Sequence, residues 1–193
     1  IYTVVPVSAA GCQGNPFTVT ATINPEPVVA NQTIVVCSDS PLTGFVLGND
    51  TDGPNVVSYN ITAINLNGLT ASAGSPAIGT GLAANVIAND AFTNSTNAPV
   101  NVVYTIVPVG DNGCLGNPFT VTATINPEPV VANHGKTVCS DAPLAVNFNP
   151  STSIAAAAYN VTALTLNGLT VSAGGATVAN GLTATALADD AFT

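Results

Sequence analysis

Hydrophobic and polar residues alternate along several short segments of the chain, and Gly, Pro and Asn separate these segments. The clearest segment is 17–24, FTVTATIN, in which Phe17 and every second residue after it fall on one face and threonines fall on the other. Such alternation predicts a strand with one buried face. We expect the preceding segment, 2–7, to pair with it as a hairpin. The same two segments recur at 104–109 and 119–126, which predicts a second hairpin of the same kind.

Two further segments carry turn signals between apolar runs. The segment 58–74 predicts a strand, a turn at Asn67 and the following glycine, and a short second strand. The segment 81–94 predicts a strand followed by one helical turn near Asp90, with the aspartate as a helix cap. Elsewhere we expect almost no helix. This density of short strands is typical of an immunoglobulin-like sandwich.

The sequence repeats itself with a period of about 100 residues. Residues 14–31 (GNPFTVTATINPEPVVAN) recur unchanged at 116–133, and residues 59–70 recur with few changes at 159–170. Solenoid repeats are much shorter, about 20–50 residues, whereas one β-sandwich domain takes about 100. The predicted fold class is therefore all-β, with tandem immunoglobulin-like β-sandwich modules of about 100 residues.

Two proline-rich linkers mark the predicted module boundaries: the first linker, residues 24–31, and the second linker, residues 126–133. Prolines stiffen a linker of this length and limit bending between its neighbours. Each linker holds two of the four prolines that we expect to act in this way: Pro25, Pro27, Pro127 and Pro129. We expect the last two strands of a preceding or donated module at 1–27, a complete module at 28–129, and the opening strands of a following module at 130–193.

Two arrangements remain open for the incomplete modules at the two ends. The chain is a window on a longer repetitive protein, or residues 1–27 of one copy complete residues 130–193 of a neighbour. The second arrangement is strand complementation, in which an added strand satisfies an open sheet edge. In both, the expected partners are other copies or adjacent modules of the same protein, joined head to tail.

Composition narrows the possible partners further. The chain has 47% hydrophobic residues but only 6% charged ones, and a single Lys with no Arg stands against ten acidic residues, for a net charge of −9. One basic residue cannot neutralise a row of phosphates, which argues against nucleic-acid binding. It also removes a polybasic route to anionic lipid. No stretch approaches the roughly 20 apolar residues of a membrane span, so we expect no membrane insertion in this segment.

The four cysteines come two to a repeat, at Cys12, Cys37, Cys114 and Cys139. CxxC spacing is absent and His134 is the only histidine, which argues against a zinc site. Two pairings are natural: Cys37 with Cys114 inside one module, or Cys12 with Cys37 and Cys114 with Cys139 across boundaries. We favour a structural disulfide between Cys37 and Cys114, because we expect both at the same end of the module. Cys12 and Cys139 then pair with neighbouring segments, or with each other between copies, outside a reducing cytosol.

Side chains that could carry catalysis are sparse. The repeat replaces His134 by a glutamine, which argues against a Ser-His-Asp arrangement. Glu26 and Glu128 lie in the linkers, where a solvated spacer carboxylate explains them. Asp50 and Asp52 could help to bind calcium, but the second copy has no acid there. We therefore expect no catalytic residue, no cofactor and no metal.

The run YTIVPVGDNGCLGNPFTVTATINPEPVV (104–131), followed by VCSDAPL (138–144), resembles the PKD-like and related immunoglobulin-like repeats of giant cell-surface adhesins of Bacteroidota. The resemblance covers nearly the whole chain. It implies secreted, surface-attached arrays, among them gliding-motility adhesins exported by the type IX system. It implies no catalytic residue.

These observations favour a non-catalytic structural segment of an extracellular, bacterial cell-surface fibre or adhesin stalk. One alternative is an adhesive module that binds surface glycans or another protein, although four Tyr, six Phe and no Trp supply few stacking surfaces for sugars. A second alternative is an accessory domain of a secreted surface enzyme.

Overall fold

The computed structural model describes residues 1–49, 53–148 and 150–193. These residues form strands, turns and loops and contain no helix, so none that could span a membrane. The strands, in chain order, are β1 (Tyr2–Val4), β2 (Phe17–Val19), β3 (Gln32–Cys37), β4 (Val56–Asn65), β5 (Thr70–Ala73), β6 (Gly79–Leu82), β7 (Ala91–Thr93), β8 (Val100–Gly110), β9 (Phe119–Asn126), β10 (Tyr159–Val161), β11 (Val171–Ala173), β12 (Ala179–Leu182) and β13 (Ala191–Phe192).

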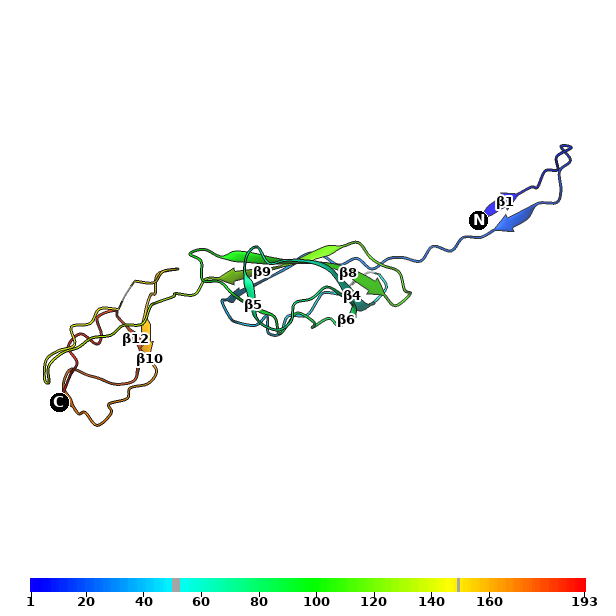
Figure 1. Ribbon diagram of the computed structural model, residues 1–193. Helices are drawn as coiled ribbons and strands as arrows, with labels where there is room; N and C mark the ends of the chain where they lie inside the picture. The colour runs from blue at the N-terminus through cyan, green and yellow to red at the C-terminus, as the bar shows by residue number, and fades with distance from the viewer. Residues whose placement is uncertain (50–52, 149) are drawn as a thin grey trace.

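The central part of the chain, residues 28–129, holds the largest sheet, with strand order β3-β9-β8-β4-β6. All pairs in it are antiparallel except β3 with β9, which run parallel from Gln32 opposite Val121 to Cys37 opposite Asn126. The β5–β7 pair forms a second, smaller layer on this sheet (Figure 1). The architecture is all-β and consistent with a β-sandwich.

The alternation of apolar residues in the sequence builds the core between these layers. Along β9, buried and half-buried residues alternate from Phe119 to the end of the strand. Tyr104 and Ile106 of β8 are fully buried and meet Phe92 of β7 in the same hydrophobic cluster. A fully buried side chain of this size contributes about 1.5–3 kcal/mol to folding, so the paired faces of β8 and β9 dominate the stability of the central part.

Turns place the strands of the two layers. Asn67 and Gly68 both have positive φ, 48° and 88°, as the predicted turn requires. The two flanking strands do not pair with each other: β4 joins the large sheet and β5 the small one. The predicted helical turn near Asp90 is wrong, because successive four-residue β-turns, each closed by a hydrogen bond between residues three positions apart, carry the chain from Ala83 to Asp90.

The hairpin β1–β2 (residues 1–27) and the C-terminal part (residues 130–193) lie on either side of the central part (Figure 1). The predicted pairing in the hairpin is confirmed, with Tyr2 opposite Val19. In the C-terminal part, the described residues 130–148 and 150–193 form two strand pairs, β10–β12 and β11–β13. These are the counterparts of β4–β6 and β5–β7. Nothing in this part corresponds to β8 and β9, and its counterpart of β3, residues 134–139, is not a strand.

Candidate functional site

The first linker lies against the loop that joins β8 to β9. In that loop, the Nδ2 atom of Asn112 donates to the backbone oxygen of Pro25 at 2.8 Å. Asn117 donates from Nδ2 to Oε1 of Glu26, also at 2.8 Å. The partners are 87 and 91 positions apart in the sequence. These bonds therefore fix the linker to the far end of the central part, which the sequence pattern of the linker alone does not indicate.

Packing reinforces this joint. Pro27 is fully buried, and a Cβ atom added at Gly116 would lie only 2.0 Å from the backbone oxygen of Pro27. Glycine is therefore needed for the linker to approach this closely. Pro25 is exposed, and in the second linker Pro127 is half-buried while Pro129, the counterpart of Pro27, is exposed. Pro129 has no counterpart of the β8–β9 loop to cover it.

The second linker leaves from the opposite end of the large sheet. Cys37 ends β3 and lies opposite Asn126, the last residue of β9. The backbone nitrogen of Ser38 donates to the oxygen of Asn126 at 2.8 Å. Glu128 in the second linker is also fixed to the central part, because its backbone nitrogen donates to the backbone oxygen of Asn94 at 3.0 Å. The two linkers thus attach at opposite ends of the central part, as an end-to-end joint requires.

Two carboxyl groups meet at the second linker. The Thr93 hydroxyl donates to Asp39 Oδ1 at 2.7 Å. Two hydrogen bonds lower the pKa of Asp39. The one with the Ser72 side chain has the larger effect, and the one with the Thr93 side chain adds to it. Loss of solvation raises the pKa of Glu128, and the nearby negative charge of Asp39 raises it further. Glu128 is therefore the carboxylate of this pair that takes up a proton first as the pH falls.

The predicted disulfide between Cys37 and Cys114 is wrong for a single module, and both residues are free thiols. Cys114 lies in the β8–β9 loop, whereas Cys37 lies opposite Asn126, at the far end of β9. The eight residues of β9 separate the two cysteines. At about 3.3 Å a residue this is roughly 25 Å, whereas disulfide geometry needs Cα atoms no more than about 7 Å apart.

Cys12 and Cys139 are also free and are exposed. Cys12 lies in the loop between β1 and β2, where its backbone nitrogen donates to the Ser8 hydroxyl at 3.2 Å. Cys139 is the last residue of the segment 134–139, which is the counterpart of β3. Each of the four cysteines therefore lies at an end of its module or of its module fragment, and none lies in a core.

A buried polar pair, which the sequence pattern did not reveal, lies inside the central part. The Tyr104 hydroxyl donates to Asp90 Oδ2 at 2.8 Å, and both residues are almost fully buried. Burial raises the pKa of Asp90, and the hydrogen bond from Tyr104 opposes this shift. Burial is the main cause that raises the pKa of Tyr104. The hydrogen bond to Asp90 and the negative charge of Asp90 raise it further. Asp90 is thus a core hydrogen-bond acceptor, not the predicted helix cap.

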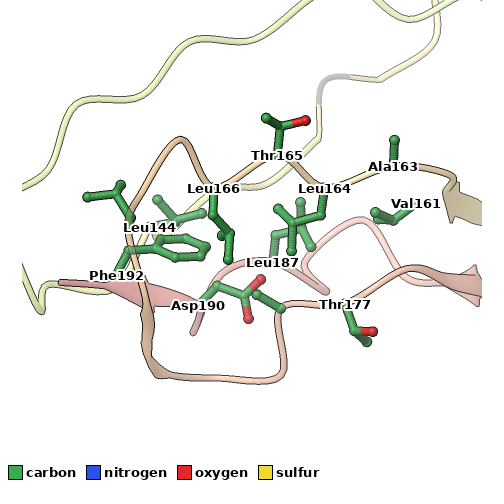
Figure 2. A pocket seen from close by; sticks show the side chains of 12 residues that line it. Leu144, Val161, Ala163, Leu164, Thr165, Leu166, Thr177, Leu187, Asp190 and Phe192 are labelled. Carbon is green, nitrogen blue, oxygen red and sulfur yellow. The ribbon is translucent and has the colours of Figure 1, made fainter.

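The C-terminal part has the same aspartate but lacks the tyrosine. Asp190, the counterpart of Asp90, is buried and accepts a hydrogen bond from the backbone nitrogen of Gly175 at 3.0 Å. Figure 2 shows its carboxylate among apolar side chains, including Leu166 and Phe192, in a cavity of about 270 Å³. Among its lining residues, Val161, Leu164 and Phe192 are the counterparts of apolar residues that form or pack against the core cluster of the central part.

The described residues show no cluster of side chains arranged for catalysis or metal binding. The ring of His134 lies edge-on to that of Phe148, with 6.4 Å between centroids. No three His, Cys, Asp or Glu side chains come together there as metal ligands would. Asp50 and Asp52, which the sequence raised as calcium ligands, lie outside the described residues.

Comparison with known families matches a PKD-like domain over residues 1–27 and 72–129. The match supports a PKD-like module. Residues 1–27 are the counterpart of 103–129, so the match includes both copies of the two strands that complete a module. PKD-like domains are generally non-catalytic and commonly extracellular. No curated protein and no solved structure matches the chain.

Proposed function

We propose that this chain is a non-catalytic structural segment of an extracellular, cell-surface fibre or adhesin stalk of the Bacteroidota type. Its immunoglobulin-like modules, with boundaries at 1–27, 28–129 and 130–193, join end to end through the two linkers. The chief support is the fixed attachment of the first linker to the β8–β9 loop. A hinge that only tethered two domains would need neither a buried proline nor a glycine contact.

The distribution of aromatic residues favours this structural role over glycan binding. The central part has five aromatic residues, and none is exposed: Phe45, Tyr59, Phe92, Tyr104 and Phe119. Sugars bind proteins largely by stacking on exposed aromatic faces. A complete module therefore offers no such platform. On an array of glycans, we expect residues 28–129 to bind no sugar above background. Saturable binding to one glycan class would favour the adhesive alternative.

The stiffness of the joint can be tested by removing its two side-chain hydrogen bonds. We expect the double variant Asn112→Ala/Asn117→Ala to loosen the first linker, because each bond contributes about 0.5–1.5 kcal/mol. Small-angle X-ray scattering on the monomer fraction should show a broader pair-distance distribution than the wild type. The circular dichroism of the β-sheet should not change.

Asn15→Ala is the matched control for this experiment. Asn15 is the counterpart of Asn117 in the hairpin, where no linker lies against it in the monomer. Its scattering should equal that of the wild type. If the double variant also scatters as the wild type does, these bonds do not set the joint, and the proposed stiff spacer loses its main support.

A further inference from the structure

The β8–β9 loop, which holds the first linker, contains one of the four Asn-Gly pairs in the sequence. The asparagines of these pairs are Asn67, Asn112, Asn167 and Asn180. Asparagine is chemically labile, and most so before glycine, which has no Cβ atom to hinder attack of its backbone nitrogen on the side-chain amide. This reaction is deamidation, and it converts the asparagine into a carboxylate. Asn112 and Gly113 are both exposed, so water has access to this pair.

The turn in this loop does not itself require an asparagine. In the β1–β2 loop, the counterpart of Asn112 is Ala10. The turn is nevertheless the same in both loops, because the nitrogens of Gly113 and Gly11 each donate to the backbone oxygen three residues earlier at 2.9 Å. The φ angles of these two glycines are also nearly equal, 80° and 82°. The role of Asn112 is therefore its contact with the linker.

Three hydrogen bonds hold the reacting groups apart while the first joint is closed. Nδ2 of Asn112 donates to the backbone oxygen of Pro25 at 2.8 Å, and Oδ1 accepts from the backbone nitrogen of Cys114 at 3.0 Å. The nitrogen of Gly113, which must attack, donates to the oxygen of Gly110 at 2.9 Å. The side-chain amide and this nitrogen must both leave their partners before they can react. Deamidation of Asn112 therefore requires local opening of the joint.

The Asn-Gly pair at Asn67 provides a reference that does not involve the linker. The turn there is closed by a hydrogen bond from the nitrogen of Leu69 to the oxygen of Leu66 at 3.0 Å, so the nitrogen of Gly68 takes no part in that bond. The side chain of Asn67 donates to the backbone oxygen of Asn101 at 2.7 Å, within the central part. Opening of the first joint changes none of these contacts.

We propose that Asn112 is a deamidation site, that the closed joint slows its reaction, and that the reaction loosens the joint permanently. The inference rests on the stiff joint proposed above and adds a covalent limit to the lifetime of that joint. Its reactants are this chain and water.

The reaction has two steps. Base in the solvent removes the proton from the nitrogen of Gly113, and this nitrogen attacks Cγ of Asn112 to close a five-membered succinimide ring. The bond from Cγ to Nδ2 breaks, and Nδ2 takes up a proton from water and leaves as ammonia. Water then breaks one of the two bonds from the ring nitrogen to a carbonyl carbon. Breakage at Cγ gives aspartate, whereas breakage at the backbone carbonyl gives isoaspartate, in which the main chain runs through the side chain.

Either product removes the donor that holds Pro25. A carboxylate oxygen then lies where Nδ2 was, and it cannot bond to the carbonyl oxygen of Pro25 because both are acceptors. The new charge also lies next to Asp111, in a chain whose net charge is already −9. Of the two side-chain bonds to the linker, the one from Asn117 to Glu26 remains. The joint is therefore weakened on one side.

The reaction is followed on the whole chain by mass spectrometry of its chymotryptic peptides after increasing times at mildly alkaline pH. Folded chain is compared with chain unfolded in urea. We expect Asn112 to react about tenfold or more slowly in the folded chain, because several hydrogen bonds must break first. Equal rates in the two states would overturn the proposal.

Asn117→Ala tests whether the joint controls this rate. The substitution removes the neighbouring bond to the linker and leaves the Asn-Gly pair intact. We expect Asn112 to react about threefold or more faster, the effect of one lost hydrogen bond, while Asn67 reacts at the wild-type rate. Asn15→Ala, at the counterpart position in the hairpin, is the matched control and should change neither rate. An unchanged rate at Asn112 in Asn117→Ala, with unchanged circular dichroism, would show that the joint does not protect this site.

Asn112→Asp reproduces one product and tests the consequence. Small-angle X-ray scattering should show a broader pair-distance distribution than the wild type; an unchanged distribution would overturn the predicted loosening. The two proposals fail separately. Rapid reaction of Asn112 in the folded chain defeats this inference even if Asn112→Ala/Asn117→Ala loosens the joint. Wild-type scattering of that double variant defeats the stiff spacer even if Asn112 reacts slowly.

Discussion

Gly116→Ala is expected to force the first linker away from the central part. The added Cβ atom would lie 2.0 Å from the backbone oxygen of Pro27 and 2.8 Å from Cγ of Pro108. A backbone oxygen cannot turn aside as a side chain can, so the linker must move. The loss then includes the burial of Pro27 and the hydrogen bonds that Pro25 and Glu26 accept.

Overpacking of this kind costs about 1–3 kcal/mol. A module of about 100 residues loses roughly 4–8 °C of Tm for each kcal/mol, which differential scanning calorimetry would resolve. In the same variant, scattering should report a more flexible joint than the wild type.

Gly14→Ala provides the control for this prediction. Gly14 is the counterpart of Gly116, and an added Cβ atom there would meet only Pro6, at 2.9 Å from its side-chain Cγ. The variant therefore reproduces the proline contact without the linker. Its central part should unfold at the wild-type temperature. If Gly116→Ala also unfolds at that temperature with unchanged scattering, the close approach of the linker does not stabilise the joint.

Tyr104→Phe is expected to destabilise the central part by about 1.5–3 kcal/mol at neutral pH, the cost of removing a hydrogen bond to a buried charged group. The hydroxyl of Tyr104 donates to Asp90 at 2.8 Å. In the variant this carboxylate loses that donor and keeps the backbone hydrogen bond from Ser75. Chemical denaturation monitored by circular dichroism would measure the loss.

The destabilisation should depend on pH in a definite direction. Burial already raises the pKa of Asp90 above its value in the unfolded chain, and removal of the Tyr104 bond raises it further. A raised pKa favours the protonated folded state, so this contribution is fully present below the unfolded pKa of about 3.9 and is lost as the pH rises through the folded pKa. The difference between wild type and variant should therefore be largest at neutral pH and shrink towards pH of about 4.

Tyr59→Phe is the control for the pH dependence, because it removes a buried tyrosine hydroxyl that bonds no charged group. The hydroxyl of Tyr59 donates to the backbone oxygen of Gly48 at 2.8 Å, a neutral acceptor. We expect a loss of about 1 kcal/mol that stays constant over the same pH range. A Tyr104→Phe loss that is equally independent of pH would mean that Asp90 is not charged in the folded module.

Local patterns in the sequence predicted what local chemistry controls. The alternation in residues 17–24 and 119–126 correctly indicated strands with one buried face, because each residue's side is set by the pleat of its own strand. Asn67 and Gly68 marked a turn because few other residues tolerate positive φ there. The helical turn near Asp90 was predicted wrongly, since short polar and apolar runs fit several kinds of turn equally well.

The errors at the cysteines and at Asp90 have a common physical cause. The sequence placed Cys37 soon after the first linker, and nothing in it showed that β3 runs parallel to the whole of β9 before reaching Cys37. Likewise, Asp90 resembled a cap until the fold brought Tyr104 to its carboxylate. Both depend on which distant strands pair and in which register.

The sequence by itself determined the repeat, the strand-forming segments, the two linkers and the shortage of catalytic side chains, because these depend on residue identity and near neighbours. Only the tertiary structure decided which ends of the module carry each cysteine, how the first linker is held, and which tyrosine reaches the buried Asp90. Those features arise from pairing between segments that are far apart in the chain. Near-identical hairpins at 1–27 and 103–129 make the point: one is exposed and the other forms the core, because only the second lies beside β3 and β4.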